Sequence, residues 1–276
     1  MSIKYGYLGP VGTFTEAALQ KIASSDDQLI AYANVTAALD AVRKGDCQKA
    51  LVPIENSVEG VVARTLDELA SGEPLVITQE VTLPVSFALL TLPATDPKDI
   101  KSIATHPHAE SQCRSFIAKN YPTAQIIETP STAAAAKGLA NKDYEAAIAG
   151  VNAAKNYNLK VVTEDIGDNQ AAVTRFVLVE KPGRKVSATG KDRTSLAVFI
   201  AIDHAGALLE ILNEFAKHQV NLTFIQSRPT GSQLGHYHFI IDAEGHIEDK
   251  PISAALAGLK QICEDIRFLG SYPQAK

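Results

Sequence analysis

Apolar residues along the first 180 positions come in short runs that alternate with segments of helical periodicity. The segments with helical spacing are residues 13–24, 61–72, 109–121, 131–142 and 151–158. The runs that predict strands are residues 3–9, 50–56, 81–92, 100–106, 124–130, 144–150, 159–165 and 169–180. Such an alternation of strands and helices predicts an α/β fold with mostly parallel sheets. The run at 81–92 is expected to open a second lobe.

The pattern changes at residues 180–193, "EKPGRKVSATGKDR", which are rich in Pro, Gly, Ser and charge and predict a linker. Beyond it, strands are expected at 194–202, 221–229, 235–243 and 267–273, and helices at 206–219 and 252–266. A Gly/Ser turn joins the two middle strands. The order β-α-β-β-α-β is the ferredoxin-like arrangement.

Composition narrows the function classes. The net charge is −5, and the longest basic stretch is "KPGRK", so a nucleic-acid or anionic-membrane surface is disfavoured. We find neither a signal peptide nor an apolar run of ~18 residues, the length that a membrane span needs. Three widely separated cysteines predict free thiols in a reducing cytoplasm and no metal site. The absence of Gly-rich phosphate-binding motifs gives nucleotide cofactors no support.

Polar clusters follow three of the predicted strands, and the ends of strands are where open α/β sheets bind ligands. The clusters are "GPVGTFT" at 9–15, "PIENSVEG" at 53–60 and "THPHAESQC" at 105–113. Helix capping explains Thr13, Asn56 or Ser57 singly. His106 or His108 could serve as a general acid or base, but an ordinary turn explains both equally well. Glu55, Asn56 and Ser57 together exceed what one cap needs. Ser131 and Thr132, in "PSTAAAA", are expected to be caps only.

The strand 169–180 carries a charge among apolar residues. Arg175 shares a face with Val173 and Val177, while Thr174 and Phe176 face the other way. An unpaired guanidinium is costly in an apolar layer, so Arg175 needs an anion. That anion is either an internal carboxylate, which makes Arg175 structural, or the carboxylate of a bound substrate. On the residues alone, the first part of the chain binds a small carboxylate.

Taken in order, "GPVGTFTEAAL", "VPIENSVEG", "HPHAESQC" and "VTRFVLV" resemble the prephenate dehydratase family. The segments 206–229 and 237–246 resemble an ACT amino-acid-sensing domain. The resemblance implies a catalytic part at residues 1–182, built as two lobes similar to type II periplasmic binding proteins, with the second lobe at about 80–160. It implies an ACT regulatory domain at 193–273. Since the first strand begins at residue 3, we expect the monofunctional form without a chorismate mutase segment.

The reaction implied is that of a carbon–oxygen lyase, which converts prephenate to phenylpyruvate, water and carbon dioxide. Because aromatisation drives it, we expect no metal, no covalent adduct and no redox cofactor. The resemblance implies that Thr174 assists departure of the ring hydroxyl by donating a hydrogen bond, with Arg175 and Glu55 as the other catalytic residues. Arg175 orients a carboxylate, and Glu55 orders the loop or the hydroxyl. The substrate-binding residues implied are Thr13, Asn56, Ser57, Gln112 and Phe176.

The ACT resemblance implies L-phenylalanine as feedback inhibitor, bound between subunits of a homodimer or homotetramer. The effector-binding residues implied are Gly206, Ala207, Leu208, Asn221, Leu222 and Gln226. Gln226 departs from the family, which more often has Glu before Ser-Arg-Pro, and so changes the charge near the effector. Five of the seven histidines lie in this part, where we expect solvated or structural roles rather than pH sensing.

Three other functions stay open at this point. Arogenate dehydratase is the nearest, because arogenate differs only by an amino group in place of the keto oxygen of prephenate. The chain could instead be a cytoplasmic protein that binds a carboxylate without reacting, or an amino-acid sensor in which only the ACT part functions. The pairing of Thr174 with Arg175, together with the amide clusters, favours catalysis over both.

Overall fold

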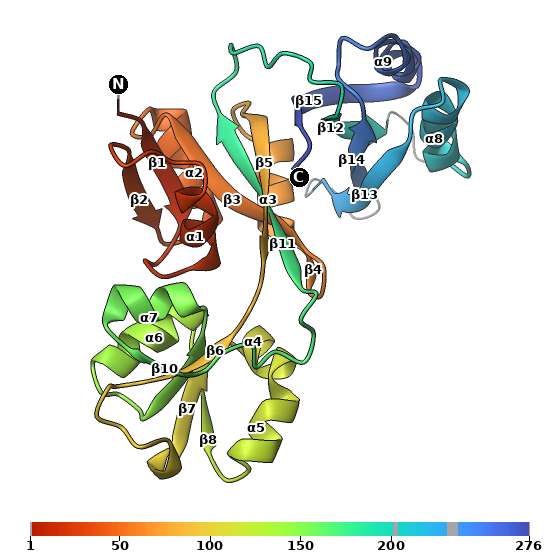
Figure 1. Cartoon of the computed structure of the whole chain (residues 1–276). Coiled ribbons are helices and arrows are strands. Elements are labelled where there is room, and N and C mark those ends of the chain that lie inside the picture. Colours follow the sequence, from red (N-terminus) through yellow and green to blue (C-terminus); the bar gives the residue numbers. More distant parts are fainter. Residues whose placement is uncertain (1, 201–203, 231–236, 276) are drawn as a thin grey trace. The chain divides into compact units, whose positions relative to one another are not determined.

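The computed structural model describes residues 2–200, 204–230 and 237–275 (Figure 1). The chain forms two compact units, one of residues 1–38, 51–62 and 82–176, and the other of 39–50, 63–81 and 177–276. The expected Gly/Ser turn, the last two residues of the expected strand 194–202 and the first two of the strand 235–243 lie outside the described residues.

The first sheet has the strand order β2-β1-β3-β11-β5, with β4 added beside β3. Strands β3, β5 and β11 run through both units, whereas β1 and β2 pair in parallel within the first. The strands are β1 (Lys4–Leu8), β2 (Gln28–Tyr32), β3 (Lys49–Asn56), β4 (Gly60–Val61), β5 (Val76–Pro84) and β11 (Val173–Glu180). The helices connected to them are α1 (Phe14–Gln20), α2 (Val35–Lys44) and α3 (Ala63–Ala70). Sequence reasoning did not identify β2 and α2.

The second sheet lies wholly in the first unit and has the order β10-β6-β9-β7-β8. Its strands are β6 (Ala88–Thr91), β7 (Ser102–Thr105), β8 (Gln125–Glu128), β9 (Ala146–Ala149) and β10 (Lys160–Thr163). Strand β7 pairs in parallel with β8 and β9. The expectation of mostly parallel pairing is wrong for β6, which is antiparallel to both of its neighbours, β9 and β10. The sheet is therefore mixed.

Helices cover both faces of this second sheet (Figure 1). They are the 3₁₀ turn η1 (Pro97–Asp99), α4 (Pro107–Gln112), α5 (Arg114–Asn120), α6 (Thr132–Ala140) and α7 (Val151–Tyr157). Leu89, Ile103 and Ile148 form one core with residues of α4 and α5. Leu90, Ala104 and Ala147 alternate with them and pack against α6 and α7. The helix expected at 109–121 is two helices, since Cys113 leaves helical geometry at φ −117 and ψ 16.

The third sheet, with the order β13-β14-β12-β15, is antiparallel throughout and belongs to the second unit. Its elements are β12 (Asp192–Ile200), α8 (Ala207–Lys217), β13 (Leu222–Pro229), β14 (Tyr237–Glu244), α9 (Lys250–Ile262) and β15 (Cys263–Pro273). This order confirms the predicted ferredoxin-like arrangement. Leu196, Ile211 and Leu259 are members of the core between the sheet and its two helices.

One boundary in this domain was predicted wrongly. Residues 263–266, expected in the last helix, begin β15 instead. The helical spacing of Ile252, Ala255 and Leu259 ends there, and Ile266 pairs with Val198 of β12. Sheet hydrogen bonds outweigh the weak helical preference of these few residues.

The predicted α/β class is thus confirmed, with two α/β sheets in the first 180 residues and a ferredoxin-like domain after them. Chain crossings from β5 to β6 and from β10 to β11 connect the two α/β sheets. Within the described residues, no helix combines the length and apolar character that crossing a membrane requires.

Candidate active site

Both polar atoms of the Asn56 side-chain amide, at the end of β3, make hydrogen bonds. Its Oδ1 accepts hydrogen bonds from the backbone N–H groups of Val58, at 2.8 Å, and Glu59, at 2.9 Å. Its Nδ2 donates to Oγ1 of Thr174 at 2.8 Å. A short amide that bonds its own following backbone is a common turn device, and here it also fixes the direction in which the N–H group points.

Thr174 lies near the start of β11, where β-branched and aromatic residues favour a buried strand. Ser57 fixes the start of this strand, because its N–H donates to the carbonyl oxygen of Val173 at 2.9 Å and its Oγ accepts from the N–H of Val173 at 3.0 Å. Thr174 is 8% exposed, and its Oγ1 accepts the hydrogen bond from Asn56. Its own hydroxyl hydrogen has no acceptor among the described residues.

Arg175, the next residue, meets an internal carboxylate. Its Nε and Nη2 atoms both lie 3.2 Å from Oε2 of Glu55. This is the structural pairing that the sequence left open as one of two alternatives. The Glu55 side chain is 39% exposed, however, so the pair is reachable from solvent on the carboxylate side.

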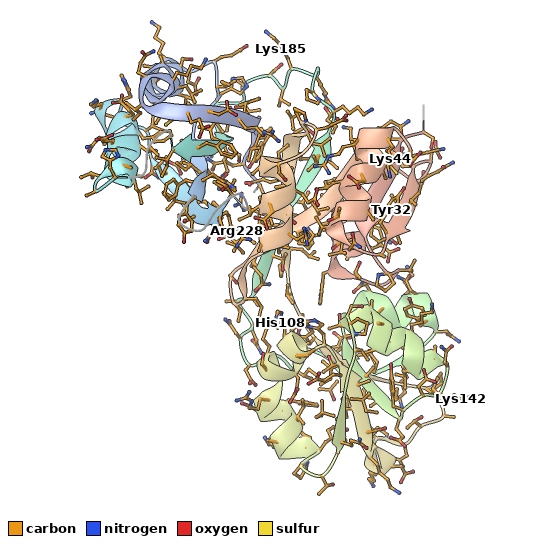
Figure 2. All side chains as sticks on the ribbon, turned by 180° about the vertical axis from the view of Figure 1, so that it is seen from behind. Tyr32, Lys44, His108, Lys142, Lys185 and Arg228 are labelled. Carbon is orange, nitrogen blue, oxygen red and sulfur yellow. The ribbon has the colours of Figure 1, made fainter. Side chains whose placement is uncertain are left out.

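Gln112, at the end of α4, is buried and donates from Nε2 to Oε1 of Glu59 at 2.8 Å. The other carboxylate oxygen of Glu59 lies 3.5 Å from Nδ1 of His108, whose side chain is largely exposed (Figure 2). Sequence reasoning missed Glu59, although it belongs to the "PIENSVEG" cluster. A carboxylate among side-chain amides was the available signal.

His106 acts as the N-cap of α4, because its Nδ1 accepts from the backbone N–H of His108 at 3.2 Å. Burial lowers the pKa of His106, and the neighbouring His108 lowers it further, so the neutral imidazole that can accept this bond is favoured. This supports the turn interpretation of His106 over a general acid.

Thr13 caps α1, with its Oγ1 accepting from the N–H of Glu16 at 3.3 Å. Its hydroxyl donates to the carbonyl oxygen of Leu8 at 3.0 Å, so its one proton is already used. The Glu16 carboxylate does not return to Thr13 as in a complete capping box; it accepts from the N–H of Gly12 at 2.6 Å. Asn152 of α7 holds the same loop by donating to the carbonyl oxygens of Gly12 and Thr13.

The structure therefore connects five of the eight expected catalytic and substrate-binding residues through β3, its turn and β11: Glu55, Asn56, Ser57, Thr174 and Arg175. Gln112 joins them through Glu59. Thr13 belongs to the separate network around α1. Phe176 is 1% exposed and is part of the hydrophobic core. Ser131, expected to be a cap, does accept from the N–H of Ala134 at 3.0 Å.

The expected effector-binding residues do not form one cluster in a single chain. Gly206, at φ +100, is the N-cap of α8, and Ala207 and Leu208 form its first turn. Asn221 and Leu222 follow the other end of that helix, where Asn221 Nδ2 donates to Oε2 of Glu244 at 3.0 Å. A helix of 11 residues is ~16 Å long, which separates the two groups. The amide of Gln226 donates to the carbonyl oxygen of Ser227 at 3.0 Å.

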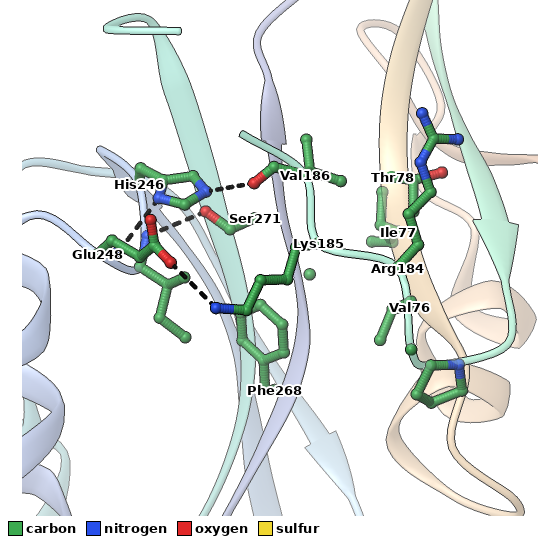
Figure 3. A pocket seen from close by; sticks show the side chains of 14 residues that line it. Val76, Ile77, Thr78, Arg184, Lys185, Val186, His246, Glu248, Phe268 and Ser271 are labelled. Carbon is green, nitrogen blue, oxygen red and sulfur yellow. Dashed lines mark hydrogen bonds and ion pairs between the residues drawn. The ribbon is translucent and has the colours of Figure 1, made fainter. Parts of the chain in front are cut away.

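A cavity of about 320 Å³ lies within the second unit, between β5, the linker and β15 (Figure 3). His246 anchors the linker there, because its Nε2 is 2.9 Å from the carbonyl oxygen of Val186. None of the expected catalytic or effector-binding residues lines this cavity. The cysteines, expected to be thiols, form no disulfide with one another, and burial raises the pKa of the Cys113 thiol to about 12.

Comparison with known proteins bears on this arrangement. The family model described as prephenate dehydratase matches residues 5–184, and the ACT domain model matches residues 194–261. A prephenate dehydratase of Amycolatopsis methanolica is 43% identical over 273 residues, which cover 99% of this chain and 89% of that protein.

Solved structures of similar fold include another prephenate dehydratase. The prephenate dehydratase of Arthrobacter aurescens, in complex with L-Phe, is 49% identical with a TM-score of 0.94, covering 99% of this chain and 90% of that one. GqqA, described as a novel type of quorum quenching acylase, is 26% identical with a TM-score of 0.87, covering 98% of this chain and 97% of that one. On the family models and the full-length relative, the chain belongs to the prephenate dehydratase family, lyases that form phenylpyruvate from prephenate, and it carries an ACT domain.

Proposed function

We propose that Thr174 donates a hydrogen bond to the ring hydroxyl of prephenate as that hydroxyl leaves. The observation that carries the proposal is the 2.8 Å bond from Asn56 Nδ2 to Thr174 Oγ1. Because the threonine oxygen is already an acceptor, its hydrogen is free to point at a ligand. An accepted hydrogen bond also polarises the hydroxyl and strengthens it as a donor. A donor held in place before reaction stabilises the charge that develops on the leaving oxygen.

Arg175 and Glu55 form the second element of the proposal. A guanidinium can hold a carboxylate with two parallel hydrogen bonds, and prephenate carries two carboxylates. Arg175 would orient one of them, with Glu55 sharing the guanidinium and keeping it in place between turnovers. The 3.2 Å separation between Arg175 Nη2 and Glu55 Oε2 supports this sharing.

The remaining residues divide by their contacts. Ser57 and Gln112 would donate to the substrate, since the Ser57 hydroxyl hydrogen and one Gln112 N–H are not used in the bonds described above. Thr13 would have to break its hydrogen bond to the carbonyl oxygen of Leu8 before it could donate to the substrate. Its role would therefore be to hold the loop before α1 in place. Phe176 would pack behind Thr174 without touching the substrate. We place this catalytic part at residues 1–182 and the ACT regulatory domain at 193–273.

The first experiment incubates purified protein separately with prephenate and arogenate and follows formation of the aromatic product. Rapid formation of phenylpyruvate from prephenate supports the proposal. A strong preference for arogenate would leave the reaction type unchanged but identify arogenate as the substrate. An acyl amide serves as a third substrate, because one similar structure is described as an acylase. Tight binding of prephenate without product would instead favour a non-catalytic sensor.

Thr174→Ala tests the role of the hydroxyl. Loss of a preorganised donor should lower kcat by ~10²–10³-fold. The matched control is Thr174→Ser, which keeps the hydroxyl and should retain most of the rate. Circular dichroism checks that both variants are folded. An alanine variant with near-normal kcat would refute the proposed role of Thr174.

For regulation, we propose that L-phenylalanine inhibits the enzyme from a site that two ACT domains share. The bound L-Phe in the Arthrobacter aurescens structure supports the choice of ligand. The positions of Gly206 and Asn221 at opposite ends of α8 support a shared site, because a second copy can bring its Asn221 to the first copy's Gly206. We propose with it that the protein is a homodimer or homotetramer and works in the cytoplasm. Sedimentation with and without L-phenylalanine, run beside the activity assay, tests it.

A further inference from the structure

Glu59 lies outside the residues so far given a role, yet it joins the Asn56 turn to α4. We propose that Glu59 is a positioning residue: its carboxylate holds the turn so that the Asn56 amide stays aimed at Thr174. The inference rests on the proposed function of Thr174 and deepens it.

The first step concerns the turn itself. Two N–H groups hold Asn56 Oδ1, and one of them is the N–H of Glu59. The chain then reverses, with Asn56 opposite Gly60 and Glu55 opposite Val61 in a two-residue strand. A pair of strands this short contributes little stability of its own. The direction of the Asn56 amide therefore depends on where the Glu59 backbone is kept.

The second step is the anchor for Glu59. Its Oε1 accepts from Gln112 Nε2 at 2.8 Å, and Gln112 is only 9% exposed. Gln112 is fixed in turn, because its backbone carbonyl oxygen accepts from the N–H of Asp168 at 2.6 Å. Asp168 lies on the segment that leads into β11 and Thr174. Both ends of the Asn56–Thr174 bond are thus attached to α4.

The third step separates the two partners of the carboxylate. A hydrogen bond from a buried amide to a charged oxygen is among the stronger kinds in proteins. The His108 contact is longer, at 3.5 Å, and the histidine side chain is 63% exposed. Exposed ion pairs contribute little. The Gln112 bond is therefore the one that positions Glu59.

Loss of the hydrogen bond between Glu59 and Gln112 should change kcat more than KM. When the anchor is lost, the turn gains freedom, and the Asn56 amide spends less time bonded to Thr174. The donor is then misplaced at the moment the hydroxyl leaves, and small misplacements of reacting groups cost up to ~10²-fold. The carboxylate contacts of Arg175 remain, because they come from β11.

The test compares Glu59→Ala with Glu59→Gln, using prephenate as substrate. The alanine variant should lose ~10–100-fold in kcat. Its KM should change by less than ~3-fold, since the loss lies in an interaction made only in the transition state. Glutamine keeps an oxygen that accepts from Gln112 and should restore most of the rate. Glu110→Ala, which removes a carboxylate from α4 outside this network, is the matched control and should match the wild type.

A double-mutant cycle with Asn56→Ala decides whether Glu59 acts through Asn56. If it does, Glu59→Ala should cause almost no further loss in the Asn56→Ala background, because coupled residues are not additive. Additive losses, an effect on KM alone, or a glutamine variant as slow as the alanine variant would each overturn the proposal. Failure of the Thr174 role is separate: it would appear as a normal rate in Thr174→Ala, whatever the cycle gives.

Discussion

Two buried ionisable side chains in the strands of this protein, those of Arg175 and His238, have very different surroundings. Arg175 has the Glu55 carboxylate beside it. His238, in β14, is 4% exposed, and neither of its ring nitrogens has a hydrogen-bond partner among the residues that the structure describes. Its ring stacks on Phe199 at a centroid distance of 5.0 Å. An imidazole can be buried in this way only if it stays neutral.

His238 is therefore predicted to make stability depend on pH. Burial lowers its pKa from the ordinary 6.5, Arg228 lowers it further, and Asp67 opposes both. The unfolded chain then binds a proton that the folded chain does not, so stability is fully present above pH 6.5 and is lost as the pH falls toward the folded pKa. His238→Leu lacks this loss and should gain stability relative to the wild type at pH 5.5.

The measurement is the thermal midpoint of both proteins at pH 8, where His238 is neutral in either state, and at pH 5.5. The difference between the two midpoints should move in favour of the leucine variant at the lower pH. Parallel pH curves for the two proteins would contradict the prediction. The comparison at pH 8 controls for the change in packing against Phe199.

At the scale of elements, β15 approaches the backbone of β5 at Gly270. A Cβ at this position would lie 2.2 Å from the carbonyl oxygen of Ile77, and the backbone φ is +143. Both features require glycine, because a side chain would clash with backbone that cannot rotate away. The cavity between β5, the linker and β15 has this contact as part of its wall.

Gly270→Ala should therefore destabilise the protein by ~2 kcal/mol or more through overpacking. Gly183→Ala is the matched control, since its φ of +129 strains alanine in a similar way while no atom lies within 4 Å of the added carbon. Urea unfolding of the two variants separates the clash from the backbone strain. Equal midpoints for the two would show that β15 can move away from β5 at little cost.

At the scale of the molecule, the ACT sheet is joined to α3 by an ion pair with two hydrogen bonds. Arg228 Nε and Nη2 donate to the two carboxylate oxygens of Asp67, each at 2.8 Å. Arg228 follows Gln226 by two residues on β13, and α3 follows the Asn56 turn in the chain. One partner of the pair is therefore close in sequence to the proposed effector residues, and the other lies on the helix that follows the proposed active-site turn.

We predict that Asp67→Asn weakens feedback inhibition more than catalysis. Both side chains are partly solvated, so the pair should contribute only ~0–1 kcal/mol to stability. An effector can shift the balance between two states of the enzyme only through contacts that differ between them. The ion pair of Arg228 with Asp67 is a contact that a movement of β13 would break. The L-phenylalanine concentration for half-inhibition should rise ~3-fold or more, while kcat/KM without effector stays within ~2-fold.

The control is Asp46→Asn, which removes one exposed carboxylate from the same unit and should leave inhibition unchanged. Inhibition assays at several phenylalanine concentrations give both values. If Asp67→Asn is inhibited like the wild type, the regulatory signal does not pass through this ion pair.

Much of the fold could be predicted from local pattern. Strand alternation placed β3 and β11, and helical spacing placed α6, α8 and α9, because each of these segments buries one face or both. The same pattern overran at Cys263, where pairing with β12 decided the structure. It also missed β2 and α2, and it could not foresee that β6 runs antiparallel to both neighbours, since direction depends on how the chain returns.

The candidate site shows the same division. The sequence by itself determined the family, the strands and turns that carry Asn56, Thr174 and Arg175, and the need of Arg175 for an anion. Only the tertiary structure decided that the anion is Glu55, that Thr13 is committed to Leu8, and that Glu59 links the turn to Gln112. The physical reason is that the spacing of apolar residues within a segment shows which of its faces is buried. A hydrogen-bond partner 53 or 120 residues away, in contrast, is selected by the folded geometry.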